Sequence, residues 1–279
     1  MIENVKAAKI NGKTVFESLE IGYFRRIDKI FKENEACFMY LEQGALELRT
    51  PAEHFKIDIG DAILAKCSNF FFEQKPLAEA ANPHTTKVVS AYFFPDIVKP
   101  LFEADLDLSK FRTPYNVKKM VMDEAIRQFF KSIEILLDHP EMATEALLKT
   151  KLRELLILLS YTEAAPSVAD FVASLFKPHE YDFRQVVEQN LYANLSIDEF
   201  AYLCSTSPAT FKRHFKEIFG EPPARYILKK KMEKALQLLQ TPRVRIADVA
   251  FDCGFESVPS FNRAFRQHYG KTPGEAQTA

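Results

Sequence analysis

Residues Leu195–Gly270 decide the fold of the C-terminal part of the chain, because they contain two segments of one design. The first, Leu195–Gly220, reads LSIDEFAYLCSTSPATFKRHFKEIFG, and the second, Arg245–Gly270, reads RIADVAFDCGFESVPSFNRAFRQHYG. Each pattern predicts a short apolar helix, a tight turn, and a second helix that begins with small polar residues and carries Arg or Lys outward. We therefore expect two helix-turn-helix units in series.

Helix start signals favour this assignment in both units. Ser196 and Glu199 have the spacing of a capping box, and Ser207 followed by Pro208 suits an N-cap and first helical position. In the second unit, Gly254 supplies a turn residue that tolerates positive φ, and Ser257 is the expected N-cap. The side chains expected to face inward are Phe200, Ala201, Leu203, Phe211, Phe215, Ile218, Ile246, Val249, Ala250, Phe261 and Phe265.

The segment between the two units predicts one long helix that would keep them rigidly spaced. It starts at Pro222-Pro223, and its expected buried positions are Tyr226, Ile227, Ala235, Leu238 and Leu239. Basic residues are concentrated here although the net charge of the chain is only -1. Between Phe211 and Arg245 they are Lys212, Arg213, Lys216, Arg225, Lys229, Lys230, Lys231, Lys234, Arg243 and Arg245, opposed only by Glu217, Glu221 and Glu233.

A basic second helix of this kind is what proteins lay into the major groove of DNA, and two of them about 10 base pairs apart would read one face of a duplex. On charge alone, a solvated helix face is the simpler interpretation. The coincidence of the charges with two candidate recognition helices favours a surface that faces phosphates.

The chain resembles the AraC/XylS family of bacterial transcription regulators over the part that contains both units. The residues that carry the resemblance are Pro223, Tyr226, Ala235, Leu239, Ile246, Ala247, Asp248, Val249, Ala250, Gly254, Phe255, Ser260, Phe261, Arg263, Phe265, Gly270, Thr272 and Pro273. There are departures, since Lys231 stands where the family usually has Arg, and Gly-Glu-Ala follows Pro273.

The resemblance implies a role for the outward residues of both recognition helices. Those expected to read bases are Ala209, Lys212, Arg213, Val258, Asn262 and Arg263, and those expected to contact phosphates are Ser207, Thr210, Lys216, Ser257, Ser260 and Arg266. Arg213 could fork onto a guanine and Asn262 onto an adenine. Val258 and Pro259 leave the second helix poor in donors, so the second unit is expected to contribute more to affinity than to readout.

The N-terminal part predicts strands from about Phe16 to Phe94, with Gly44 and Gly60-Asp61 at turns, and hence a small barrel or sandwich. After Pro114 the pattern predicts a helix with a face at Met122, Ile126, Phe129, Ile133 and Leu136, which ends at His139-Pro140. In a second helix, about Met142–Tyr161, Leu148, Leu152, Leu155 and Leu159 have coiled-coil spacing and predict a dimerisation stripe, or a cover for the barrel.

Together these patterns and the resemblance predict an α+β chain in two domains. A cupin-like regulatory barrel with a helical dimerisation hairpin is expected over residues 1–165, and an all-α DNA-binding domain over 166–279, with Thr162–Ser167 as the linker. Cupins often hold metals through clustered histidines, but His54 and His84 are far apart and lack the HxH pattern. We therefore expect no metal, no cofactor and no enzymatic activity.

The aromatic residues of the expected regulatory domain have two possible roles. Phe70, Phe71, Phe72, Tyr92, Phe93 and Phe94 either line a ligand pocket or form a packed core. The effector is accordingly a small molecule or, as the alternative, a protein partner, unless the regulator is constitutive. An enzyme tethered to DNA and an architectural binding protein are the competing classes; the first lacks the metal histidines, and the second would discriminate poorly between sequences.

The expected partners are double-stranded promoter DNA, a second copy in a homodimer, and RNA polymerase, with no membrane. We expect a cytoplasmic protein, because the start of the chain lacks the pattern of a signal peptide and no apolar run approaches the ~18 residues that span a bilayer. The cysteines are scattered and lack CxxC spacing, so we interpret them as reduced core thiols, with a reactive sensor thiol as the alternative. They are Cys37, Cys67, Cys204 and Cys253.

Overall fold

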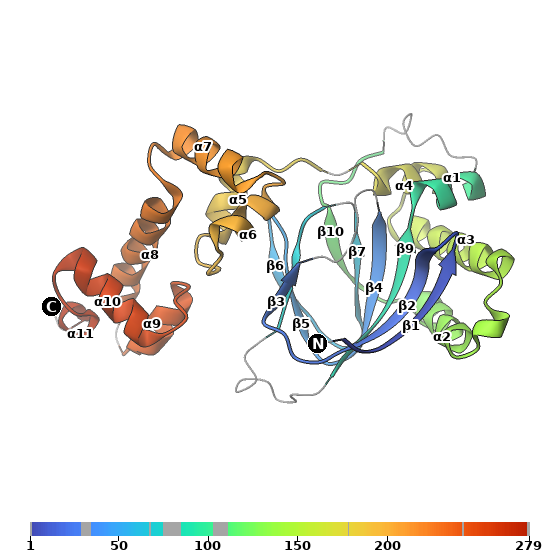
Figure 1. The fold of residues 1–279 in the computed structure, drawn as a ribbon, viewed down its shortest axis with the longest axis horizontal. Helices are drawn as coiled ribbons and strands as arrows, with labels where there is room; N and C mark the ends of the chain where they lie inside the picture. The colour runs from blue at the N-terminus through green and yellow to red at the C-terminus, as the bar shows by residue number, and fades with distance from the viewer. Residues whose placement is uncertain are drawn as a thin grey trace. The chain divides into compact units, whose positions relative to one another are not determined.

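The chain forms two compact units, each with its own hydrophobic core. The computed structural model describes residues 2–28, 35–66, 68–74, 85–102, 111–177, 179–241 and 243–277. The first unit comprises Met1–Thr50 and His54–Glu180, and the second comprises Pro51–Glu53 and Tyr181–Ala279 (Figure 1). His84 and Cys67, which the sequence analysis singled out, lie outside the described residues.

The first unit is built on two antiparallel sheets. The larger has the order β1 (Ile2–Ile10), β2 (Lys13–Ile21), β9 (Thr86–Phe93), β4 (Ala36–Gln43), β7 (Asp61–Ala65) and β10 (Val117–Val121). The smaller has the order β3 (Arg26–Asp28), β8 (Phe71–Glu73), β5 (Leu46–Arg49) and β6 (His54–Ile57). The predicted α+β class with a strand-rich N-terminal part is confirmed.

Two strands fall outside the predicted limits. Strand β1 precedes the predicted start at Phe16, and β10 lies where a helical pattern was expected after Pro114. Both are edge strands of the larger sheet, and most side chains of β1 are exposed. An edge strand with little buried surface has no strong apolar alternation, so its sequence carries a weak signal.

Alternation along β9 supplies the larger sheet with two different faces, as expected from the two-residue period of a strand. Val89, Ala91 and Phe93 join the core that packs against the helices. Val88 and Tyr92 point to the other side and join the core between the sheets. The six aromatic residues of the sequence analysis are therefore divided between both roles, since Phe93 is packed core while Tyr92 borders the space between the sheets.

Helices cover the face of the larger sheet that lies away from the smaller sheet (Figure 1). They are α1 (Pro95–Phe102), α2 (Glu124–Asp138), the 3-10 turn η1 (Pro140–Met142), α3 (Glu145–Thr162) and α4 (Val168–Leu175). Asp123 caps α2 by accepting a hydrogen bond from the amide of Ile126, and the predicted apolar face of this helix is buried. The expected break at His139-Pro140 is also present.

The leucine stripe of α3 is part of this core. Leu148, Leu152, Leu155 and Leu159 are at most 1% exposed and pack in the cluster that includes Phe129 and Phe16. In this arrangement they cover the sheet, which was the alternative interpretation of their spacing. A dimer interface built on this helix would have to use its outward residues, and charging Leu155 would disrupt the fold instead of separating two copies.

The second unit is entirely helical in its described residues. It contains α5 (Phe183–Asn190), α6 (Ile197–Leu203), α7 (Pro208–Phe219), α8 (Pro223–Leu239), α9 (Ile246–Asp252), α10 (Val258–Tyr269) and α11 (Pro273–Gln277). One core gathers around Phe200, Phe211 and Phe215, and the other around Phe261 and Phe265. Several positions differ from prediction. Ile218 is 37% exposed and Met232 of α8 is fully buried, while the positions expected to be buried that are only partly so are Tyr226, Ile227, Leu238 and Ile246.

Helix α4 belongs to the first unit by its contacts with α1 and α3, so the compact units divide after Glu180. The functional boundary at 165/166 stays a prediction. No helix in the described part of the chain is long and apolar enough to cross a membrane. Burial raises the pKa of the Cys204 thiol to about 12 and that of Cys253 to about 11, which favours core thiols over a reactive sensor at these two positions.

Candidate nucleic-acid interface and the cavity between the sheets

The first helix-turn-helix unit consists of α6, a tight turn and α7. Ser196 and Glu199 form the predicted capping box: the amide of Glu199 donates to Ser196 Oγ at 3.2 Å, and the amide of Ser196 donates to Glu199 Oε2 at 2.7 Å. Ser207 caps α7 by accepting from the amide of Thr210 at 3.2 Å, with Pro208 in the first turn. The local sequence thus fixes where the recognition helix begins.

The second unit repeats this geometry with α9 and α10. Ser257 caps α10 by accepting from the amide of Ser260 at 3.3 Å. Gly254 has a φ of 73°, and Ser205 holds the corresponding position of the first unit at 53°. The residues after these positions donate to matching carbonyls, Thr206 to Ala201 and Phe255 to Ala250, so both turns close in the same way.

The outward faces of α7 and α10 are exposed and basic. Ala209, Lys212, Arg213 and Lys216 are exposed on α7, as are Asn262, Arg263 and Arg266 on α10. None of these basic side chains has an ion-pair partner among the described residues. Val258 differs, because it is half-buried and packs against the core of its own unit. This burial limits how far Val258 could reach toward a base.

The serine and threonine hydroxyl groups near these helix starts already make hydrogen bonds within the protein. Ser207 Oγ donates to Thr210 Oγ at 2.9 Å, and Ser260 Oγ donates to the carbonyl of Ser257 at 2.8 Å. Ser207 is exposed, whereas Thr210, Ser257 and Ser260 are half-buried. Their hydroxyl groups therefore stabilise the helix starts, and phosphate contacts by them would add to that role.

Two lysines of the basic run have a structural function instead of an outward one. Lys231 Nζ donates to the carbonyl of Gly254 at 2.8 Å, and Lys234 Nζ donates to the carbonyl of Asp252 at 2.7 Å. The ammonium of Lys234 also lies 3.9 Å from the ring centroid of Tyr192. These contacts join α8 to the end of α9, so the sequence-based assignment of the whole basic run to a phosphate-facing surface is too broad.

The turn of the second unit lies directly against the chain that precedes α6. A Cβ atom at Gly254 would be 2.4 Å from the carbonyl oxygen of Tyr192, which is closer than any side chain tolerates. Asn194 Nδ2 donates to Glu256 Oε1 at 3.1 Å beside this contact. Gly254 is needed for this approach as well as for its positive φ.

The N-terminal compact unit contains a cavity of about 790 Å³ between its two sheets. Strands β2 and β9 supply much of its lining, with additions from β3, β4, β5 and β8 of both sheets. Most lining side chains are apolar, and they include Phe24, Met39, Phe72, Val88 and Phe94. Packed interiors leave few voids larger than a water molecule, so a space of this size is suited to a small ligand.

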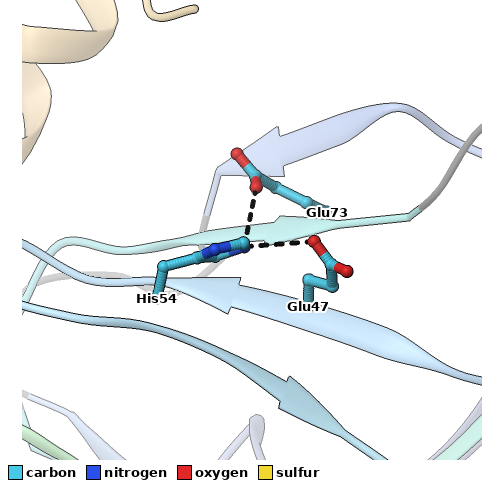
Figure 2. Close-up of side chains that lie close together, drawn as sticks. All are labelled: Glu47, His54 and Glu73. Atoms are coloured by element: carbon cyan, nitrogen blue, oxygen red, sulfur yellow. Dashed lines mark ion pairs between the residues drawn. The ribbon is translucent and has the colours of Figure 1, made fainter. Parts of the chain in front are cut away.

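His54 lies between two carboxylates on the smaller sheet. Its Nε2 is 3.1 Å from Glu47 Oε2 and 3.4 Å from Glu73 Oε2, as Figure 2 shows. Glu73 is also held by Arg49, whose Nε is 2.9 Å from Oε1, and by Arg26, whose Nε is 2.6 Å from the same oxygen. The spacing of His54 and His84 in the sequence gives no sign of this arrangement, because both glutamates come from other strands.

A histidine and two carboxylates within reach of one another can hold a divalent cation. Here two guanidinium groups already neutralise Glu73, so the local charge favours a proton on His54 over a metal ion. Hydrogen bonds to Glu47 and then Glu73 raise the pKa of His54. Burial alone would raise the pKa of Glu73, but hydrogen bonds from His54 and Arg49 outweigh burial and lower it to about 2.

Comparison with known proteins agrees with both halves of this description. Residues 200–279 match a family described as a helix-turn-helix domain, and residues 36–171 match the ExsA N-terminal regulatory domain. The chain belongs to the AraC/XylS family. Its relatives are transcription regulators, so the chain is a DNA-binding transcription regulator and not an enzyme.

Three relatives show how far the similarity extends. The thermoregulatory protein LcrF of Yersinia pestis is 21% identical over 264 residues, which cover 94% of this chain and 96% of LcrF. The virulence regulon transcriptional activator VirF of Yersinia enterocolitica and the regulator ExsA of Pseudomonas aeruginosa are each 26% identical over 140 residues. These two matches cover 50% of this chain and about half of each relative.

Among solved structures, some match about a third of this chain and others match nearly all of it. An AraC-type DNA-binding domain from Chromobacterium violaceum is 33% identical and covers 33% of this chain and 86% of its own, with a TM-score of 0.29. ToxT of Vibrio cholerae, solved with an unsaturated fatty acid bound, is 15% identical and covers 96% of this chain and 97% of its own, with a TM-score of 0.40.

The contact at Gly254 leads to a first prediction for this regulator. Gly254→Ala should destabilise the C-terminal compact unit by about 1–3 kcal/mol, because the methyl group must displace the Tyr192 carbonyl. It should also weaken binding to DNA that carries two half-sites. Gly270→Ala is the matched control. Gly270 has a φ of 72°, but a Cβ atom there meets nothing within 4 Å. Equal losses in the two variants, measured by urea unfolding and DNA titration, would contradict a role for the contact.

The His54 cluster leads to a second prediction, for pH dependence. A histidine whose folded-state pKa is raised adds stability below its ordinary value of about 6.5, and this contribution is lost as pH rises through the folded-state value. Wild type should therefore exceed His54→Gln in unfolding free energy by more at about pH 6 than at about pH 8.5. The pH dependence should shrink when Glu47 is changed to Gln in both proteins. A difference that is constant with pH would refute the prediction.

Proposed function

We propose that this regulator reads promoter DNA by placing α7 and α10 in successive stretches of the major groove. One observation carries the proposal: each helix starts at a serine cap and exposes basic side chains that have no ion-pair partner among the described residues. A solvated amphipathic helix would not need two copies of this surface in one compact unit. Double-stranded DNA has the complementary charge.

In this proposal the base-reading residues are Ala209, Lys212, Arg213, Val258, Asn262 and Arg263, and the phosphate contacts are Ser207, Thr210, Lys216, Ser257, Ser260 and Arg266. The first helix contributes more discrimination, because Lys212 and Arg213 are both exposed while Val258 is half-buried. Arg213 has the geometry to bind guanine through two hydrogen bonds, and Asn262 can bind adenine similarly.

The N-terminal unit controls DNA binding through a small ligand in the cavity between its sheets. A ligand changes DNA affinity only if it binds two conformations of the protein unequally. Control by a protein partner, or no control, is the alternative, in which the cavity has no regulatory role. The regulator acts in the cytoplasm and works with RNA polymerase. Its role as an activator is supported by its similarity to VirF, which is a transcriptional activator by name.

The proposed readout leads to a third prediction. Arg213→Ala should cost about 1–3 kcal/mol on the specific site and relax preference at one base pair. Lys216→Ala should weaken specific and random DNA about equally and flatten the salt dependence, because a phosphate contact carries no sequence information. Both are measured by titration at several salt concentrations. Lys149→Ala, which removes one charge from the first unit, is the control. Sequence-blind losses for Arg213→Ala would end its proposed base-reading role.

A homodimer belongs to the proposal on the strength of the family resemblance, and it yields a fourth prediction. Since Leu148, Leu152, Leu155 and Leu159 are buried in one copy, the interface must use other residues of the N-terminal unit. Sedimentation at tens of micromolar should show dimers in the presence of two-site DNA. Monomers under all conditions, with and without DNA, would remove the dimer from the proposal.

A further inference from the structure

The cavity between the sheets has a size and shape set by strand alternation. On β2 it is lined by Glu17, Leu19 and Ile21, and on β9 by Val88, Ser90 and Tyr92; Phe94, which follows β9 directly, also lines it. Its volume of about 790 Å³ lies within the range of small-molecule sites. The apolar part of this lining would bury the body of a ligand, and the polar part would decide which end group is accepted.

The charged groups of the lining are predominantly acidic. They are Glu17, Glu35 and Asp96, against the single ammonium of Lys13. Lys13 is already engaged, because its Nζ lies 2.7 Å and 2.6 Å from the two carboxylate oxygens of Asp96. It also lies 5.1 Å from the ring centroid of Phe94. A ligand carboxylate would have to displace Asp96 to reach this cation.

Glu17 is the acidic group whose bonding is incomplete. Tyr92 Oη donates to Glu17 Oε1 at 2.6 Å, and Tyr92 itself is 6% exposed. Glu17 Oε2 accepts no hydrogen bond from the described residues, and Glu17 has no ion-pair partner among them. Burial raises the pKa of Glu17, although the Tyr92 hydroxyl opposes the shift. A cation beside Oε2 would restore the stability of the ionised form.

We propose that the cavity binds a small apolar amine whose ammonium group donates hydrogen bonds to the Glu17 carboxylate while its apolar body packs between the two sheets. This inference rests on the proposed control by a small ligand, and it names the chemical class of that ligand. Tyr92 positions Glu17 by fixing one oxygen, which leaves the other for the ammonium group. The Glu17 carboxylate would also repel an acidic ligand of the same shape.

The test uses the full-length protein and three compounds that share one body. These are 4-phenylbutylamine, 4-phenylbutanol and 4-phenylbutyrate, titrated by calorimetry and followed by thermal unfolding at neutral pH. The amine should bind most tightly and raise Tm by mass action. Glu17→Gln should weaken amine binding about tenfold to a hundredfold, the value of a hydrogen bond to a charged group, and leave alcohol binding within about twofold.

Glu20→Gln is the matched control, because Glu20 lies on the same strand but does not line the cavity. It should bind the amine like wild type. Tighter binding of the alcohol or the acid, or an amine affinity that Glu17→Gln leaves unchanged, would overturn the amine assignment while control by a ligand could stand. Binding of the amine without any change in DNA affinity would support the site and count against the proposed control. Failure of all three compounds to bind overturns the amine proposal.

Discussion

The arrangement of the two helix-turn-helix motifs depends on one contact, in which the turn before α10 lies against the chain before α6. The Tyr192 carbonyl occupies the space that a side chain at Gly254 would need. Lys231 and Lys234 complete the contact from α8 by donating to carbonyls at the end of α9 and in the turn. A long helix alone would hold the two units at its ends, but this lateral contact also restricts rotation of one unit about the other.

The same contact explains why the basic residues of the C-terminal compact unit divide into two groups. An ammonium that donates to a main-chain carbonyl and lies over an aromatic ring stabilises the fold, and burial lowers the pKa of Lys231 accordingly. Arg213 and Lys216 have no such contacts and remain free to meet phosphates or bases. Charge counted along the sequence cannot separate these groups, because the difference lies in which carbonyls α8 meets after folding.

How much of the structure the sequence could predict depends on how far apart in the chain the contacting residues lie. The helix-turn-helix units were predictable to the residue at Ser196, Ser207 and Ser257, because a cap is a contact between neighbours three positions apart. The cluster of Glu47, His54 and Glu73 was not, because three strands must first be brought into register. The leucine stripe of α3 shows the middle case, where spacing identifies the apolar face but not its partner.

The cavity arises from a mismatch between the two sheets of the N-terminal unit. Strands β1, β2, β4 and β9 have eight or nine residues each, whereas the strands of the smaller sheet have only three or four. Helix α2 covers the outer face of the larger sheet with Phe129 and Phe130, which pack on Phe38 of β4, but a short sheet cannot cover an equally wide apolar surface on the inner face. An apolar ligand would complete this second core, so its binding energy and the stability of the unit would be coupled. A regulator that depends on a ligand needs such an incomplete core, because a filled core leaves no space in which the ligand could bind.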